Sequence, residues 1–152
     1  MEAFLVLADA AHNEDGTGKI GILGGGWSIV GPSVPPMSVV TFLRIDAHEA
    51  VHPIDFVLRL LDAQRRPVSV ASDGGERRPL EFGGRVHLID EDKPIDELTE
   101  MVGFHASFAI GIGRLPIRSG QAYTWILDIA GREAASLTFA VRAEADEDDE
   151  EA

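Results

Sequence analysis

Apolar and polar residues alternate strictly along several short stretches of the chain. The clearest stretch is residues 104–112, where Phe104 and Phe108 fall on one side of an extended backbone and His105 and Ser107 fall on the other. Successive side chains of a β-strand point to opposite faces, so this alternation is typical of a strand with one buried face. The pattern recurs over residues 123–129 and 135–142. The C-terminal third therefore predicts three antiparallel strands.

Earlier stretches extend the prediction to eight or nine strands, separated by Gly, Pro, Asn and Asp, which favour turns. We expect these strands over residues 3–11, 19–23 with a continuation through 27–30, 37–46, 54–63, 67–72 and 80–89. Together they predict an all-β, antiparallel sandwich like that of immunoglobulin and fibronectin type III domains.

Two segments could instead form a helix. Residues 54–61 also satisfy the i, i+3, i+4 spacing of a helix, but the short length and the flanking Pro53 and Asp62 favour a strand. A short helix is expected within residues 91–102, with Asp92 as its N-cap and Pro94 near its first turn.

Tyr123 enters the first of the last two alternating stretches, six residues after Ile117 and three after Gly120. This spacing resembles the tyrosine corner of immunoglobulin-like and fibronectin type III domains. In that corner, a Tyr entering the penultimate strand forms a hydrogen bond to the backbone a few residues upstream. The resemblance implies a structural role for Tyr123 and not that of a catalytic phenol.

The chain is also similar to a family of small uncharacterised bacterial, actinobacterial proteins. The resemblance rests on residues 8–11 (ADAA), residues 19–27 (KIGILGGGW), and Leu115, Pro116, Gly120, Tyr123 and Trp125. It implies a β-sandwich of unknown function and supplies no functional residue.

The chain has 152 residues, which fit one domain. Its formal net charge is −13, and seven of the 26 acids lie in the last nine residues, which leaves 19 acids against 13 bases in the rest. A block of like charge without apolar residues cannot offset its ordering entropy. We therefore predict a single sandwich domain over residues 1–143 and a disordered acidic tail over residues 144–152. The tail is either simply solvated or a docking segment for a basic partner.

Composition argues against several classes of partner. An acidic protein repels phosphate backbones and anionic lipid, so we expect binding neither to nucleic acid nor to a membrane. The N-terminus lacks the basic region of a signal peptide, which predicts a cytoplasmic protein. The chain contains no cysteine, so disulfides, thiol nucleophiles and Cys-ligated zinc are excluded.

His48, Glu49 and His52 match the H-E-x-x-H pattern of zinc peptidases. That pattern needs a helix, because residues four apart then share a face and both imidazoles reach one metal ion. Here the five residues lie between two expected strands, and Pro53 disfavours helix at His52. Glu76, a conceivable third ligand, is in a Gly-rich and Arg-rich loop. A weaker alternative is adventitious cation binding by Asp46, His48 and His52.

Two other features that could indicate a binding site have simpler structural explanations. His87 and His105 lie on the polar sides of their expected strands, and their rings would meet only if those strands were neighbours. Residues 21–26 (GILGGG) are followed by no helix and no Lys-Ser or Lys-Thr pair, so a phosphate-binding loop is disfavoured. These glycines are better explained as a bulge or bend where the strand changes sheet, which lets Trp27 turn inward.

These observations predict a non-enzymatic interaction module with an unknown protein partner, and they assign no catalytic, cofactor-binding or metal-binding residue. One alternative is a self-assembling structural subunit, because residues 37–46 and 54–63 carry apolar residues on both faces; for example, Val40 and Phe42 lie opposite Val39 and Leu43. A second alternative is a metal-dependent hydrolase centred on His48, Glu49 and His52.

Overall fold

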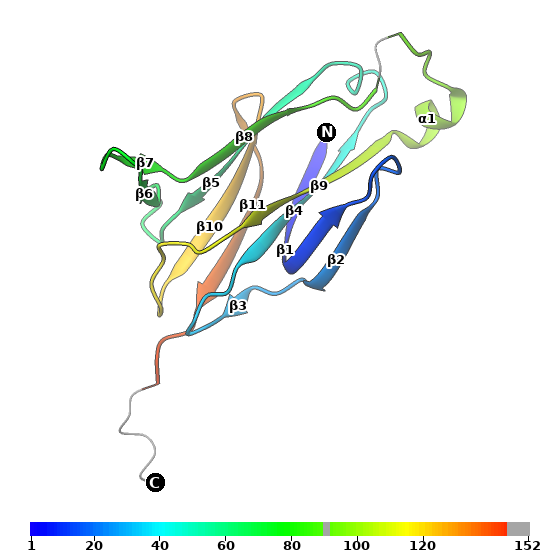
Figure 1. Cartoon of the computed structure of the whole chain (residues 1–152). Helices are drawn as coiled ribbons and strands as arrows, with labels where there is room; N and C mark the ends of the chain where they lie inside the picture. Colours follow the sequence, from blue (N-terminus) through cyan, green and yellow to red (C-terminus); the bar gives the residue numbers. More distant parts are fainter. Residues whose placement is uncertain (90–91, 146–152) are drawn as a thin grey trace.

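The computed structural model describes residues 1–89 and 92–145, and within them the chain is all-β (Figure 1). It contains one short helix, α1 (Glu97–Val102), and eleven strands: β1 (Glu2–Asn13), β2 (Ile20–Gly25), β3 (Ile29–Val30), β4 (Met37–Ile45), β5 (Ile54–Leu61), β6 (Ser69–Ala71), β7 (Arg77–Pro79), β8 (Glu81–Val86), β9 (Phe104–Ile112), β10 (Ala122–Ile129) and β11 (Arg132–Val141). The count exceeds the expected eight or nine for two reasons. The expected continuation through residues 27–30 is a separate strand, β3, and the three-residue strand β7 was not expected.

The strands form two main sheets. The four-stranded sheet has the order β2-β1-β4-β9, and the five-stranded sheet has the order β3-β11-β10-β5-β8. A separate ribbon pairs β6 with β7. All pairings are antiparallel except that of β3 with β11.

The hydrophobic core lies between the two main sheets, which confirms the expected sandwich. On β10, Tyr123, Trp125, Leu127 and Ile129 are each at most 4% exposed and belong to the core. Core residues of the other sheet include Val39 and Leu43 of β4, and the rings of Phe56 on β5 and Phe108 on β9 meet across the interface with centroids 4.6 Å apart. The alternation in the sequence thus identified the inner faces correctly.

The glycines at the end of β2 allow the chain to change sheet. Gly24 and Gly26 have φ of 59° and 92°, a region that residues with a Cβ rarely adopt. The Gly26 N–H donates to the Leu7 carbonyl at 2.8 Å, and the chain then passes from β2 in one sheet to β3 in the other. Trp27 turns inward and meets the ring of Phe139 edge-on, at 6.2 Å and 87°. The bend predicted for residues 21–26 is therefore confirmed.

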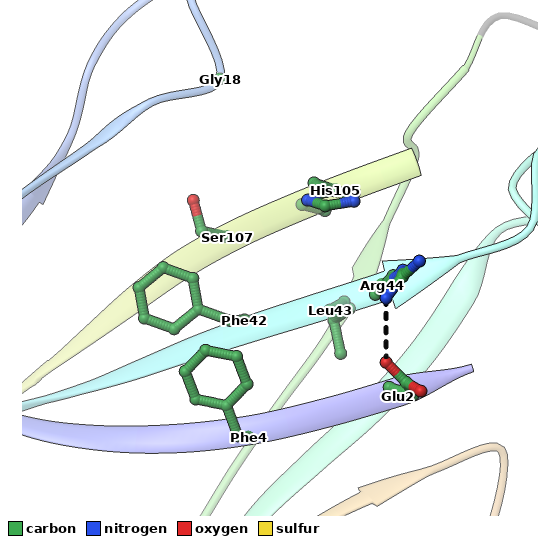
Figure 2. A pocket seen from close by; sticks show the side chains of 9 residues that line it. Glu2, Phe4, Gly18, Phe42, Leu43, Arg44, His105 and Ser107 are labelled. Atoms are coloured by element: carbon green, nitrogen blue, oxygen red, sulfur yellow. Dashed lines mark ion pairs between the residues drawn. The ribbon is translucent and has the colours of Figure 1, made fainter. Parts of the chain in front are cut away.

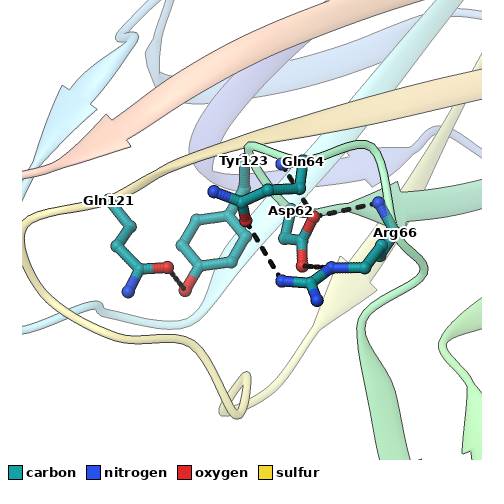
Figure 3. A network of polar contacts seen from close by, with 5 residues as sticks. All are labelled: Asp62, Gln64, Arg66, Gln121 and Tyr123. Carbon is teal, nitrogen blue, oxygen red and sulfur yellow. Dashed lines mark hydrogen bonds and ion pairs between the residues drawn. The ribbon is translucent and has the colours of Figure 1, made fainter.

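Tyr123 makes the hydrogen bond expected of it. Its buried hydroxyl accepts from the Arg118 backbone N–H at 2.8 Å, and β10 is the penultimate strand. Gln121 and the turn between Asp62 and Arg66 lie beside this tyrosine (Figure 3). The bond supplies a partner for a backbone group in the connection that leads from one sheet to the other.

Of the two segments that could form a helix, one is a strand and the other contains the helix. Residues 54–61 form strand β5, as predicted. The helix begins later than expected, because the Thr99 N–H donates to the Asp96 carboxylate at 2.7 Å and so makes Asp96 the N-cap. Asp92 was therefore the wrong cap. No helix in the described part of the chain is long and apolar enough to span a bilayer.

The tail prediction is untested over most of its length. Glu144 and Ala145 are exposed and belong to no strand or helix, and residues 146–152 lie outside the described residues.

Candidate functional site

The outer face of the four-stranded sheet carries an apolar hollow of about 500 Å³ (Figure 2). At its centre the rings of Phe4 on β1 and Phe42 on β4 are stacked, with centroids 4.8 Å apart and planes 14° from parallel. The two residues face each other across the β1–β4 pairing. Phe4 is 58% exposed, which is a high exposure for a phenylalanine side chain.

The hairpin formed by β1 and β2 bends toward this face. Strands β1 and β4 lie between β2 and β9 in the sheet order, so a flat sheet would hold β2 and β9 about 14 Å apart. Their Cα atoms instead approach within 8 Å. Gly18, in the turn of this hairpin, lines the hollow together with Phe4 and Phe42. Part of the outer face is therefore covered by the chain itself.

Two fully buried residues of this sheet do not point into the core. Ala8 of β1 and Val40 of β4 are 0% exposed, yet neither belongs to the core cluster between the sheets. Val6 and Ile22 lie near Ala8 around Gly25, where an added Cβ would meet Ile22 at 2.8 Å. The apolar residues on both faces of β4, which suggested self-association, are thus covered in part within one chain.

The rim of the hollow is polar, and the charges of its one Arg and one Glu side chain cancel. Glu2 and Arg44 form an exposed ion pair at 3.7 Å, and on the neighbouring strand β9 His105 lies beside Arg44 and Ser107 beside Phe42 (Figure 2). The arrangement provides an apolar floor of two rings with hydrogen-bonding groups at its edge. Such an arrangement can bind an apolar group and orient it through hydrogen bonds at the rim.

A second, shallower hollow continues from His105 toward the helix, lined by Thr99, Val102, Gly103 and Phe104. Beside it, α1 has no buried residue and exposes Leu98, Met101 and Val102, at 72%, 78% and 60%. The two hollows and these helix residues are called the apolar surface below. Its extent is greater than that of isolated exposed residues, which are common on any protein.

The His48–His52 segment is a turn and not a helix, as its position between strands predicted. It contains one helix-like hydrogen bond, from the Ala50 N–H to the Asp46 carbonyl at 3.1 Å. The His48 side chain is 81% exposed and lies 3.7 Å from Glu100, while His52 lines a different hollow beside His87. Among the described residues no three His, Asp or Glu side chains lie close enough to hold a metal ion.

The remaining candidates from the sequence are also separated. Glu76 is in the turn of the β6–β7 ribbon. His87 follows β8 of the five-stranded sheet, whereas His105 is on β9 of the other sheet, so their strands are not neighbours. Of the singled-out histidines, only His105 lies on the apolar surface.

Sequence reasoning missed Phe4 and Gly18. A usable signal for Phe4 was present, because residues 4–8 are apolar on both faces of the strand, as residues 37–46 are. No pattern indicated Gly18, since its position depends on the bend of the hairpin.

Comparison with known proteins identifies the chain only at the level of its family. No curated protein and no solved structure matches it. One family matches residues 3–142, which run from the start of β1 past the end of β11. The chain therefore belongs to a family of unknown function, DUF6941.

Proposed function

We propose that this protein is a non-enzymatic interaction module that binds a protein partner through the apolar surface. The observation that carries the proposal is the exposed Phe4–Phe42 stack on the floor of the hollow. Burying a phenylalanine stabilises a complex by roughly 2 kcal/mol, and interfaces concentrate their affinity in a few aromatic anchors. The partner we expect presents an apolar side chain to the rings and polar groups to Glu2, Arg44 and His105.

Selection of random peptides displayed on phage, followed by titration of the enriched peptides, tests this proposal. We expect peptides with apolar anchors that bind Phe4→Ser at least about tenfold more weakly than the original protein, a loss of about 1.4 kcal/mol. Val57→Ser is the matched control, because Val57 is a half-buried residue on the outer side of the five-stranded sheet. Failure to select any peptide, or equal weakening by both substitutions, would contradict the proposal.

One observation favours self-assembly as a second candidate function. Strand β9 is a nine-residue edge of the four-stranded sheet and contains no Lys, Arg, Asp, Glu or Pro, the residues that usually protect an edge. Its core-facing Phe104, Phe108 and Ile110 are only half-buried. Within the described residues, no loop donates or accepts a backbone hydrogen bond at this strand. The edge is therefore open to a further strand.

The β9 sequence can pair with itself. An antiparallel pairing centred on Phe108 places Phe104 opposite Ile112 of a second copy, and it brings no like charges together. The same pairing sets the two Ala109 residues diagonally, about 7–8 Å apart. A charge at position 109 should then oppose pairing with itself and favour pairing with the opposite charge.

Light-scattering mass tests this second function. A self-assembling chain gives twice 16.4 kDa at high concentration, whereas Ala109→Lys and Ala109→Glu are each monomers and their equimolar mixture is again a dimer. Ala109→Ser, which adds no charge, should remain dimeric. A 16.4 kDa mass for the unsubstituted protein at all concentrations would exclude self-assembly through β9.

A further inference from the structure

A polar hollow of about 710 Å³ lies at the end of the sandwich where the chain leaves β11, away from the apolar surface. Three arginines from different segments line it: Arg66 from the turn after β5, Arg77 from β7 and Arg118 from the connection between β9 and β10. Asp62 is the one acid among its lining residues. A concave, net cationic surface is notable on a chain with a net charge of −13.

Asp62 is already occupied by its own turn (Figure 3). One carboxylate oxygen accepts the backbone N–H groups of Gln64 and Arg66, both at 2.9 Å, and the other accepts from Arg66 Nε at 3.3 Å. Asp62 therefore compensates Arg66, and the described residues that line the hollow provide no further carboxylate for the other two arginines.

The other two arginines have little competition for an anion. Arg77 donates one hydrogen bond, to the Ser69 carbonyl at 3.3 Å, and the Arg118 side chain has no ion pair or hydrogen bond within the part of the chain that the structure describes. The guanidinium groups match carboxylates in shape and donate paired hydrogen bonds to them. The hollow is thus chemically suited to a carboxylate-rich segment.

Such a segment begins beside the hollow. Gly120 lines it, and a Cβ added to Gly120 would lie 3.5 Å from the Cβ of Ala143. Residues 144–152 follow directly and contain seven acids and no base. Nine residues can extend roughly 30 Å from Ala143, so acids along the segment have different reaches and the later ones can span the hollow. A tethered segment has an effective concentration in the millimolar range, which offsets the weakness of each exposed ion pair.

We propose that the acidic C-terminal segment, residues 144–152, binds to the hollow lined by Arg66, Arg77 and Arg118 of its own chain. The attraction is electrostatic, so it weakens as salt shortens the Debye length to about 3 Å at 1 M. A free acidic peptide must compete with the tethered segment for the same arginines.

The experiment uses the full chain and a variant in which the seven acids of residues 144–152 are replaced by Gln or Asn. A free peptide of sequence EADEDDEEA is titrated into both proteins in low salt, and the backbone amide signals of Gln64, Gly120 and Gln121 are followed by NMR. We expect the peptide to bind the neutralised variant at least about tenfold more tightly than the original protein, because only the original supplies its own competitor.

Arginine variants locate the binding site. In the neutralised background, Arg77→Ser and Arg118→Ser should each weaken peptide binding by about tenfold, whereas Arg85→Ser, on the outer face of the five-stranded sheet, should leave it unchanged. Thermal melts check that every variant is folded. The proposal is overturned if the peptide binds neither protein, binds both equally, or responds to Arg85→Ser as strongly as to Arg118→Ser. None of these outcomes depends on Phe4 or on β9.

Discussion

The outer faces of the two sheets differ in the side chains that they expose. On the five-stranded sheet, charged residues are paired: Arg59 binds Asp128 at 2.6 Å, and Arg85 binds Asp55 at 2.7 Å. The four-stranded sheet also has one ion pair on its outer face, Glu2 with Arg44, but beside it the stacked rings of Phe4 and Phe42 line a hollow.

The comparison shows that a sandwich needs only one apolar face on each sheet. The five-stranded sheet also carries apolar residues on its outer face, but Ile126 is 0% exposed and Val57 is half-buried, and pairs of opposite charge lie beside them. On the four-stranded sheet, the β1–β2 hairpin covers only part of the outer apolar residues. The uncovered part is the basis of the proposed interaction surface.

The largest effect should come from placing a charge in the covered part of the four-stranded sheet. Val40→Asp introduces a carboxylate at a position with 0% exposure and no cationic partner, and we expect it to lower the free energy of unfolding by about 4 kcal/mol. Ser136→Asp is the control on the outer face of the other sheet, where the side chain is exposed and the change should stay within about 0.5 kcal/mol. Urea unfolding of both variants measures the difference. Similar stabilities would show that the hairpin does not seal this face.

A smaller loss is expected from breaking the tighter ion pair on the five-stranded sheet. Arg59→Met leaves the Asp128 carboxylate, which is 20% exposed, without its partner, and it should cost about 1 kcal/mol, or about 3 °C in melting temperature. Arg85→Met breaks the more exposed pair with Asp55 and should produce a smaller shift than Arg59→Met. If Arg85→Met destabilises the protein as much as Arg59→Met, burial does not decide the strength of these pairs.

The exposed ring stack should contribute still less to stability. Phe4→Ser removes a cross-strand aromatic pair from an exposed position and should cost about 0.5 kcal/mol. Phe56→Ser, which removes a ring packed against Phe108 between the sheets, is expected to cost about 3 kcal/mol. Calorimetry of the two variants separates a ring retained for binding from a ring needed for folding. A large loss for Phe4→Ser would assign the outer stack to stability.

The smallest expected effect is on the pH dependence of stability, and for Asp55 it involves the outer face of the five-stranded sheet. Hydrogen bonding to Arg85 lowers the pKa of Asp55, and backbone N–H groups of Arg66 and Thr99 lower the pKa values of Asp62 and Asp96. A carboxyl whose pKa is lower in the folded state stabilises the fold above the unfolded pKa, near 4, and loses that contribution as pH falls through the folded pKa.

Melting temperature should therefore fall as pH drops below about 4. Asp55→Asn should flatten this decline slightly, because Asp55 then no longer takes up a proton on unfolding. An unchanged pH profile for Asp55→Asn would show that the exposed pair with Arg85 contributes nothing measurable to the pH dependence.

Much of the fold could be predicted because it depends on local pattern. The alternation at residues 104–112 gave both bounds of β9 and its inner face, and Pro53 and Asp62 correctly favoured a strand for β5. The prediction for Tyr123 succeeded for the same reason, since its hydrogen bond joins residues only five apart. The predicted start of the helix was wrong because Asp92 and Asp96 are equally good N-caps by residue type. Only the hydrogen bond from the Thr99 N–H to the Asp96 carboxylate distinguishes them.

The candidate sites were less predictable because each joins residues that are far apart in the sequence. Phe4 and Phe42 meet through the register of β1 with β4. The three arginines come from two connections and from β7, and they line one hollow at the end of the sandwich. Bacterial origin, cytoplasmic location and the likeness to immunoglobulin or fibronectin domains remain predictions.

The sequence by itself determined the class of fold, the inner face of each long strand, the bend at residues 21–26 and the acidic character of the C-terminal segment. These properties follow from side-chain alternation, from the conformational freedom of glycine and from charge, all of which are local. The tertiary structure alone decided which outer face exposes a ring stack, which strand edge is open and which arginines line the hollow beside Ala143. The physical reason is that strand order and register bring distant residues together, and no local pattern encodes them.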